Sequence, residues 1–191
     1  MEKNRTLAVL LSGRGSNFIA IQEAIARGDL RASICCVASN VADAPGLLRA
    51  LSLGLCTLCL PSRGVHRVEY DQRLLAALKP FDPGLICLAG FMRVLSPDFV
   101  AAFRGRILNI HPALLPSFPG LHAQRQALEN GVRITGCTVH LVDEGVDTGR
   151  ILMQRAVAVE DGDTEESLSA RILQEEHDVY WRAIAQQLDK L

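Results

Sequence analysis

The chain alternates short apolar runs with helix-like segments through its first half. Four runs are short and continuous enough for buried strands, at residues 7–11, 33–38, 55–60 and 85–89. The segments between them repeat apolar side chains at helical spacing, at residues 17–27, 44–53 and 68–78. Strands that alternate with helices predict right-handed crossovers and a parallel sheet with helices on both faces.

After Gly90 the pattern becomes less regular. Residues 97–103 predict a short helix, because Ser96 can cap it and Pro97 fits the first helical position. The remaining elements are strands at 107–110, 135–142 and 151–159, and helices at 122–129 and 164–188. We expect one α/β domain over residues 1–191, with a Rossmann-like, mostly parallel twisted sheet and helices on both faces.

Composition narrows the class of protein. The chain has 191 residues, is 49% hydrophobic and 21% charged, and carries a formal net charge of −1. No field of one sign covers such a molecule, so we expect it to bind neither nucleic acid nor an anionic membrane. No apolar run approaches the ~20 residues that span a bilayer, and the first run is too short for a signal peptide. These features predict a cytoplasmic protein.

The six cysteines include a C-x-x-C pair, Cys56 and Cys59. Such a pair can form a redox centre or half of a zinc site. It can also consist of buried strand cysteines that behave as small hydrophobic residues. The sequence favours buried cysteines, because residues 55–60 form a continuous apolar run and no second C-x-x-C follows.

A glycine-rich turn, S-G-R-G-S-N, lies between the first strand and the first helix at residues 12–17. Glycines allow a ligand to approach the backbone, and a helix N-terminus offers free N–H groups to a phosphate. The turn matches neither the dinucleotide fingerprint nor the Walker loop. A tight turn capped by Ser16 or Asn17 explains the pattern equally well, so both interpretations stay open.

Asn109 and His111 end a predicted strand, two positions apart, so their side chains can share one face. Pro112, Pro116 and Pro119 follow and predict a long irregular loop, which in a compact domain is often functional. An amide donor beside an imidazole suits a carbonyl oxygen that becomes negatively charged. The alternative is that both side chains only satisfy the backbone of the turn.

An acidic glycine-containing loop follows His140, with Asp143, Glu144 and Asp147 between residues 142 and 149. A carboxylate near an imidazole keeps the ring charged and accepts protons. A solvated hairpin loop is the alternative, and His140 is either a partner of the site or a polar strand residue.

Six motifs extend this pattern over nearly the whole chain. They are S-G-R-G-S-N at 12–17, S-N-V-A-D-A-P-G at 39–46, L-A-G-F-M-R-V-L at 88–95, L-N-I-H-P-A-L-L-P-S-F-P-G-L-H at 108–122, H-L-V-D-E-G-V-D-T-G at 140–149 and Q-E-E-H at 174–177. In this order they resemble the glycinamide ribonucleotide formyltransferase family of folate-dependent enzymes. A glycine pair is normal after the acidic residue in that family, whereas this chain has Thr148 and Gly149.

The resemblance implies the formyltransferase fold and formyl transfer from 10-formyltetrahydrofolate to the amine of glycinamide ribonucleotide, in purine synthesis. Asn109, His111 and Asp147 match the catalytic trio, and Thr138 and His140 match supporting positions. The trio would stabilise the oxyanion with Asn109 and protonated His111, and Asp147 would take the amine proton through water. Both substrates are small molecules, no metal is required, and the assembly is a monomer or a homodimer.

The binding residues are implied in the same way. The N-terminal half would bind the ribonucleotide, with its phosphate at Gly15, Ser16 and Asn17 and its ribose at Glu176, which joins the site from the last helix. The C-terminal half would bind folate and carry the catalysis. The implied folate contacts are Arg67, Met92, Arg93, Val94, Leu95, Asn109, Val142, Asp143, Glu144, Gly145 and Val146.

Three other functions are weighed against this one. A formyltetrahydrofolate hydrolase would carry an additional N-terminal regulatory domain, for which there is no room before Leu7. A methionyl-tRNA formyltransferase would add a C-terminal domain and a basic surface. A folate- or nucleotide-binding module without activity would not need the intact trio.

Overall fold

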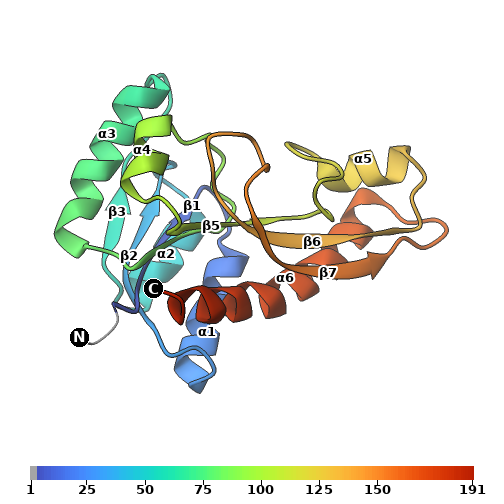
Figure 1. The fold of residues 1–191 in the computed structure, drawn as a ribbon, viewed down its shortest axis with the longest axis horizontal. Coiled ribbons are helices and arrows are strands. Elements are labelled where there is room, and N and C mark those ends of the chain that lie inside the picture. The colour runs from blue at the N-terminus through green and yellow to red at the C-terminus, as the bar shows by residue number, and fades with distance from the viewer. Residues whose placement is uncertain (1–3) are drawn as a thin grey trace.

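The computed structural model describes residues 4–191, which form one seven-stranded sheet in the order β3-β2-β1-β4-β5-β6-β7 (Figure 1). The five strands from β3 to β5 in this order run parallel to one another. Strand β6 is antiparallel to β5, and β7 is antiparallel to β6. The strands are β1 (Thr6–Leu11), β2 (Ser33–Ser39), β3 (Thr57–Cys59), β4 (Leu85–Leu88), β5 (Ile107–His111), β6 (Ile134–Leu141) and β7 (Ile151–Ala158).

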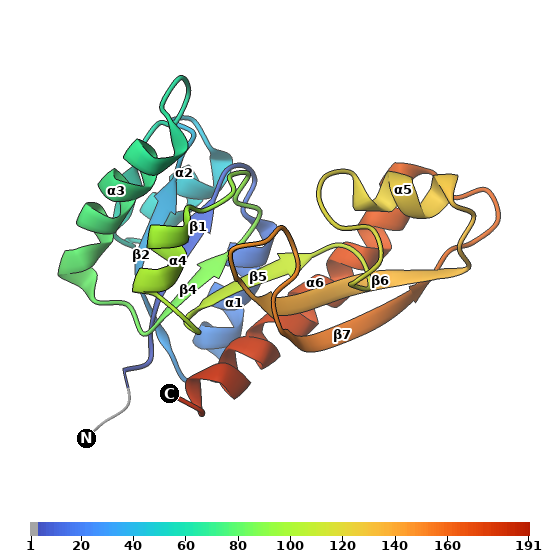
Figure 2. The ribbon, with the colours of Figure 1, turned by 45° about the horizontal axis from the view of Figure 1, so that its top comes forward.

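Helices cover both faces of this sheet (Figure 2). They are α1 (Ser16–Arg27), α2 (Pro45–Ser52), α3 (Arg67–Leu78), the 3-10 helix η1 (Lys79–Phe81), α4 (Pro97–Ala102), α5 (Ala123–Glu129) and α6 (Glu165–Leu188). Alternate residues of β1 face opposite sides, as the pleat of a strand requires. Leu7 and Val9 pack with α1 and α6, whereas Ala8 and Leu10 pack with α3 and α4. The predicted α/β class with a mostly parallel, doubly covered sheet is therefore confirmed.

The predicted interpretation of the C-x-x-C pair is wrong. The predicted strand at 55–60 shortens to Thr57–Cys59, and Cys56 and Cys59 are both exposed. The physical reason is position, because β3 is an edge strand with a neighbour on one side only. Composition alone does not distinguish an apolar edge strand from a buried central strand. Both thiols are free and face solvent.

Helix starts follow local chemistry. Ser96 accepts a hydrogen bond from the Phe99 N–H at 3.4 Å, and Pro97 occupies the first turn of α4, as predicted. Thr164 and Ser167 form a reciprocal capping box at the start of α6. Of the two interpretations left open for this loop, the turn capped by Ser16 or Asn17 is not observed. Gly15 is the N-cap, in a left-handed conformation with φ 72° and no capping side chain.

The long helix α6 runs from the antiparallel strands to α1. It packs against α1 and against the antiparallel strands, as both ribbon views show (Figures 1 and 2). The fully buried Tyr180 places its hydroxyl 2.9 Å from the Leu88 carbonyl and 3.1 Å from the Leu108 carbonyl. This contact joins β4 to β5 where both strands approach the site. Among the described helices, none is long and apolar enough to cross a membrane.

Candidate active site

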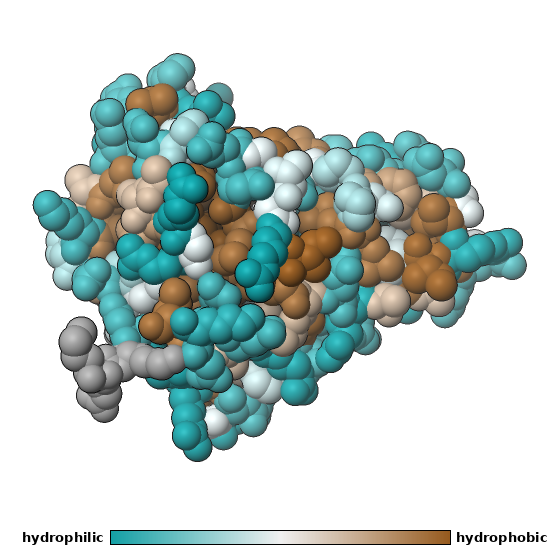
Figure 3. Space-filling model, viewed as in Figure 1, coloured by the Kyte–Doolittle hydropathy of each residue, from teal (hydrophilic) through white to brown (hydrophobic). Residues whose placement is uncertain are grey.

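A cleft of about 500 Å³ opens at the carboxyl ends of β4 and β5. Ligands of open α/β sheets bind at this edge, where the strand order reverses. The walls are the segment after β4, the loop between β5 and α5, and the acidic loop between β6 and β7. Apolar surface gathers across the middle of the face shown in Figure 3. Exposed apolar side chains of the cleft are Met92, Val94, Leu121 and Val146.

The Asp147 carboxylate is the centre of a polar network in the cleft. Its Oδ1 lies 3.4 Å from both Asn109 Nδ2 and His140 Nε2. Its Oδ2 lies 3.3 Å from His111 Nδ1 and accepts the Gly120 N–H at 2.8 Å. The register of β5 on β6 pairs Asn109 with His140, which explains how four side chains from two strands and a loop converge. The expected trio and His140 are thus brought together.

The surroundings of His111 determine its protonation. The ring is buried, with Nδ1 facing Asp147 and Nε2 lying 2.8 Å from the Phe118 carbonyl oxygen. Both neighbours are acceptors, and only a ring with a proton on each nitrogen can donate to both.

Opposing effects act on Asp147. Burial alone would raise the pKa of this carboxyl, but the hydrogen bond with His140, the Gly120 N–H and the charge of His111 together lower it. The carboxyl of Asp147 therefore stays ionised near neutral pH. Its backbone lies at φ 55°, a conformation that non-glycine residues rarely adopt. Such strain is found at functional sites.

Thr138 supports the site from outside the cleft lining. Its buried hydroxyl donates to the Ala113 carbonyl at 2.6 Å and accepts the Leu115 N–H at 3.0 Å. Gln154 Nε2 also donates to the Thr138 hydroxyl oxygen, at 2.9 Å. The hydroxyl therefore fixes the chain directly after His111, which agrees with the supporting position implied by the resemblance.

Most of the expected folate residues line the cleft. They are Met92, Arg93, Val94, Leu95, Asn109, Val142, Asp143, Gly145 and Val146. Arg93 directs its charge into the protein, because its guanidinium lies 4.5 Å from the Tyr70 ring centroid and donates to the Ser62 and Val65 carbonyls. Arg67 and Glu144 are exposed and lie outside the lining.

The expected ribonucleotide residues form a second cluster, at the start of α1. Asn17 Nδ2 donates to Glu176 Oε2 at 2.7 Å, and both side chains are buried. Burial raises the pKa of Glu176 to about 7, against the opposing effect of the Asn17 hydrogen bond. Within residues 4–191, Asn17 Oδ1 has no hydrogen-bond partner. Gly15 approaches Gly46 so closely that a Cβ at position 15 would lie 3.0 Å from the Gly46 Cα.

Several functional contacts could not be named from sequence. The Phe118 carbonyl and the Gly120 N–H both touch the trio, and the only sequence signal for them was the proline-rich loop that contains them. Backbone contacts depend on loop conformation, which composition does not specify. Among the described residues, no group of three or more His, Cys, Asp or Glu side chains is arranged to hold a metal ion.

Comparisons with known proteins agree with this geometry. The family model described as formyl transferase matches residues 5–184. The phosphoribosylglycinamide formyltransferase of Escherichia coli (strain K12) is 44% identical over 175 residues, which cover 91% of this chain and 82% of that protein. The crystal structure of glycinamide ribonucleotide transformylase 1 from Symbiobacterium toebii aligns with a TM-score of 0.94 and 46% identity, covering 97% of this chain and 88% of that one.

Longer relatives share the same region. The trifunctional purine biosynthetic protein adenosine-3 of Drosophila pseudoobscura pseudoobscura is 50% identical over 192 residues. The match covers 96% of this chain but 14% of that relative. The chain therefore corresponds to one part of such a protein.

Proposed function

Because the chain belongs to the formyl transferase family, we propose that it transfers the formyl group of 10-formyltetrahydrofolate to the amine of glycinamide ribonucleotide. The products are formylglycinamide ribonucleotide and tetrahydrofolate, in de novo purine biosynthesis. The substrates are small molecules, and the proposed compartment is the cytoplasm. The names of relatives that cover most of this chain, in Escherichia coli and Symbiobacterium toebii, support glycinamide ribonucleotide as the acceptor of the formyl group.

One observation carries the proposal: the Asp147 carboxylate contacts Asn109, His111 and His140 at the base of an apolar cleft. An acyl transfer to an amine needs a donor for the developing oxyanion, a positive charge near it and an acceptor for the amine proton. Asn109, His111 and Asp147 supply these groups in this order.

The proposed roles follow from these contacts. The neutral amine attacks the formyl carbon, and the formyl oxygen becomes negatively charged. Asn109 Nδ2 and the charged His111 ring stabilise that oxygen. His111 Nε2 releases the Phe118 carbonyl oxygen and donates to the formyl oxygen in its place. Asp147 keeps the ring charged and accepts the amine proton through water. The folate nitrogen takes up a proton and leaves with the electron pair of the broken bond.

The two clusters suggest how the substrates divide the single domain. We assign the folate ring to the cleft between Met92–Leu95 and the acidic loop, where apolar side chains are exposed to receive it. We assign the ribonucleotide phosphate to the N-terminus of α1 at Gly15, Ser16 and Asn17, and the ribose to Glu176. Arg67, exposed at the start of α3, is assigned to the distant end of the folate.

The test is a spectrophotometric assay of folate deformylation with and without glycinamide ribonucleotide. We expect turnover only when the amine substrate is present, with stoichiometric formylglycinamide ribonucleotide. Deformylation at the same rate without the amine would identify a hydrolase. Binding of both ligands without turnover would identify an inactive binding module.

A further inference from the structure

The acidic loop between β6 and β7 is held closed by two of its own side chains. The Thr148 hydroxyl donates to Asp143 Oδ1 at 2.7 Å, and the Gly145 N–H donates to the same oxygen at 3.0 Å. One carboxylate oxygen therefore joins the start, the middle and the end of the loop. A hydrogen bond to an ionised acceptor is stronger than a neutral one.

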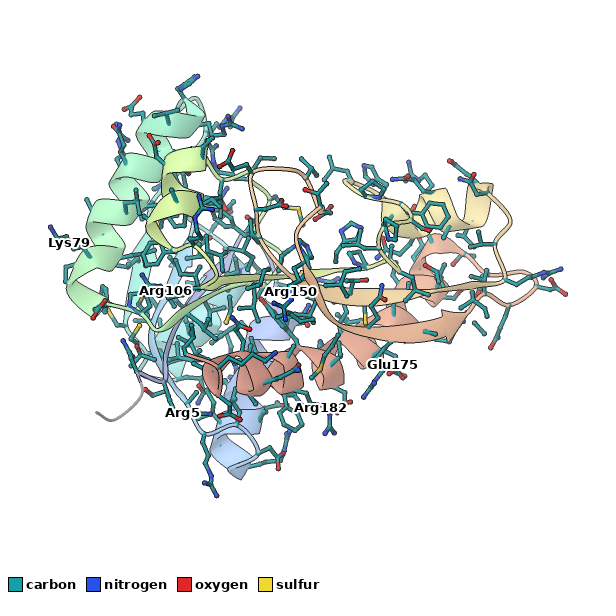
Figure 4. All side chains as sticks on the ribbon, in the orientation of Figure 1. Arg5, Lys79, Arg106, Arg150, Glu175 and Arg182 are labelled. Atoms are coloured by element: carbon teal, nitrogen blue, oxygen red, sulfur yellow. The ribbon has the colours of Figure 1, made fainter. Side chains whose placement is uncertain are left out.

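The backbone of the loop is fitted closely to this contact. A Cβ on Gly145 would lie 2.0 Å from the Thr148 hydroxyl oxygen, so position 145 has room only for glycine. A Cβ on Gly149 would lie 1.7 Å from the Leu141 carbonyl oxygen. The loop then joins β7 next to Arg150, which is labelled in Figure 4.

We propose that Thr148 is a positioning residue that acts through Asp143 to hold the loop in its folate-binding form. The inference rests on the proposed function, because the loop supplies Val142, Gly145 and Val146 to the wall assigned to folate. Thr148 itself lies outside the cleft lining and is exposed. Its effect on folate must therefore pass through the loop.

The position of Asp147 does not depend on this contact alone. Its carboxylate is fixed separately by the Gly120 N–H and by His111 and His140. Removal of the Thr148 hydroxyl therefore lowers the population of the binding-competent loop without displacing the catalytic carboxylate. When only a fraction of molecules is competent, the apparent dissociation constant rises by the inverse of that fraction. Bound folate restores the loop, so the maximal rate is preserved.

The experiment compares Thr148→Val, which keeps the shape and removes the hydroxyl, with Thr148→Ser, which keeps the hydroxyl. For Thr148→Val we expect the folate KM and the Kd of tetrahydrofolate, measured by calorimetry, to rise about 3–10-fold. The kcat and the KM for glycinamide ribonucleotide should stay within about twofold of wild type. Thr148→Ser should restore folate binding. Thermal midpoints show that each variant is folded, and Thr148→Ala replaces Thr148→Val if the latter is not.

A double-mutant cycle tests the route through Asp143. On an Asp143→Ala background, Thr148→Val should have no further effect on folate binding, because the acceptor is already absent. The same 3–10-fold loss on that background would overturn the inference, as would an unchanged tetrahydrofolate Kd or a lower kcat at unchanged folate KM. If the wild type forms no formylglycinamide ribonucleotide, the proposed function fails, whereas the tetrahydrofolate titration still tests the loop.

Discussion

Asn17 Nδ2 donates a hydrogen bond to Glu176 Oε2 at 2.7 Å, and this contact joins α1 to α6 across 159 positions of the sequence. The carboxyl is buried, and its burial raises its pKa to about 7 from an ordinary value of 4.5. The folded protein therefore keeps a proton on Glu176 over a range in which the unfolded chain has lost it. Stability should depend on pH for this reason.

As the pH rises from about 4.5 to about 7, we expect the free energy of unfolding to fall by roughly 3 kcal/mol because of Glu176. Glu176→Gln carries no titrating proton, so this part of the pH dependence should disappear. Urea denaturation of both proteins at several pH values from 5 to 7 measures the difference. Glu175→Gln, at the half-buried neighbouring position, is the control and should keep the wild-type slope. Parallel slopes for wild type and Glu176→Gln would contradict the assignment.

Asp147→Asn should fold and yet lose turnover. Asparagine tolerates the left-handed backbone at φ 55° better than other substitutes, and it keeps the shape of the side chain. It neither holds His111 charged nor accepts the amine proton, so we expect kcat to fall by about 10²–10⁴. Steady-state kinetics and a thermal melt on the same preparation measure both effects.

Glu144→Gln is the matched control for that variant, because Glu144 is exposed in the same loop and lies outside the cleft lining. It should change stability by no more than about 0.5 kcal/mol and leave turnover near wild type. If Asp147→Asn also retained near wild-type turnover, the proton acceptor would be elsewhere, and Asp143 would be the next residue to replace.

The two glycines of the first loop should respond differently to alanine. Gly15 has φ 72°, and an added Cβ would meet the Gly46 Cα at 3.0 Å. A Cβ added at Gly13 would have no neighbouring atom within 4 Å. We expect Gly15→Ala to lower the free energy of unfolding by about 1–2 kcal/mol and Gly13→Ala to change it by less than about 0.5 kcal/mol. Gly15→Ala should also weaken the binding of glycinamide ribonucleotide far more than the binding of tetrahydrofolate. Equal weakening of both would mean that the phosphate binds elsewhere.

Cysteine reactivity provides a direct check of the edge strand. Cys56 and Cys59 are exposed, whereas Cys87 and Cys137 are buried and burial raises the pKa of both thiols. An aromatic disulfide reagent should therefore label Cys56 and Cys59 rapidly in the native protein, and Cys87 and Cys137 only after unfolding. Cys56→Ser with Cys59→Ser should remove two thiols from the rapid phase. A rapid phase that keeps all its thiols after this double substitution would contradict the exposed position of the pair.

Sequence periodicity predicted the alternation of strands and helices because buried parallel strands and amphipathic helices have different periods. It also placed Asn109 and His111 on one face of a strand end, which β5 confirms. It could not separate an edge strand from a buried one, and so misplaced Cys56 and Cys59. Edge position is a property of strand order, which depends on contacts between distant segments.

The same limit applies to the site. The acidic loop was recognised from its composition, but its contact with Gly120 depends on the path of the proline-rich loop between β5 and α5. The contact between Thr148 and Asp143 depends on the backbone path of the acidic loop. Neither contact follows from composition, since each requires a particular loop conformation.

The order of the elements along the chain, with α6 after all seven strands, has a consequence for biosynthesis. A nascent chain that has emerged only as far as residue 160 already contains Asn109, His111 and Asp147, but it lacks Glu176 and Tyr180. The apolar face of β1 that α6 covers in the finished molecule is then open to solvent. Domains are translated from the N-terminus at ~5–20 residues per second, so this face stays exposed for seconds. Until α6 emerges, we therefore expect the nascent chain to expose this apolar face and to lack the carboxylate proposed to bind the ribose.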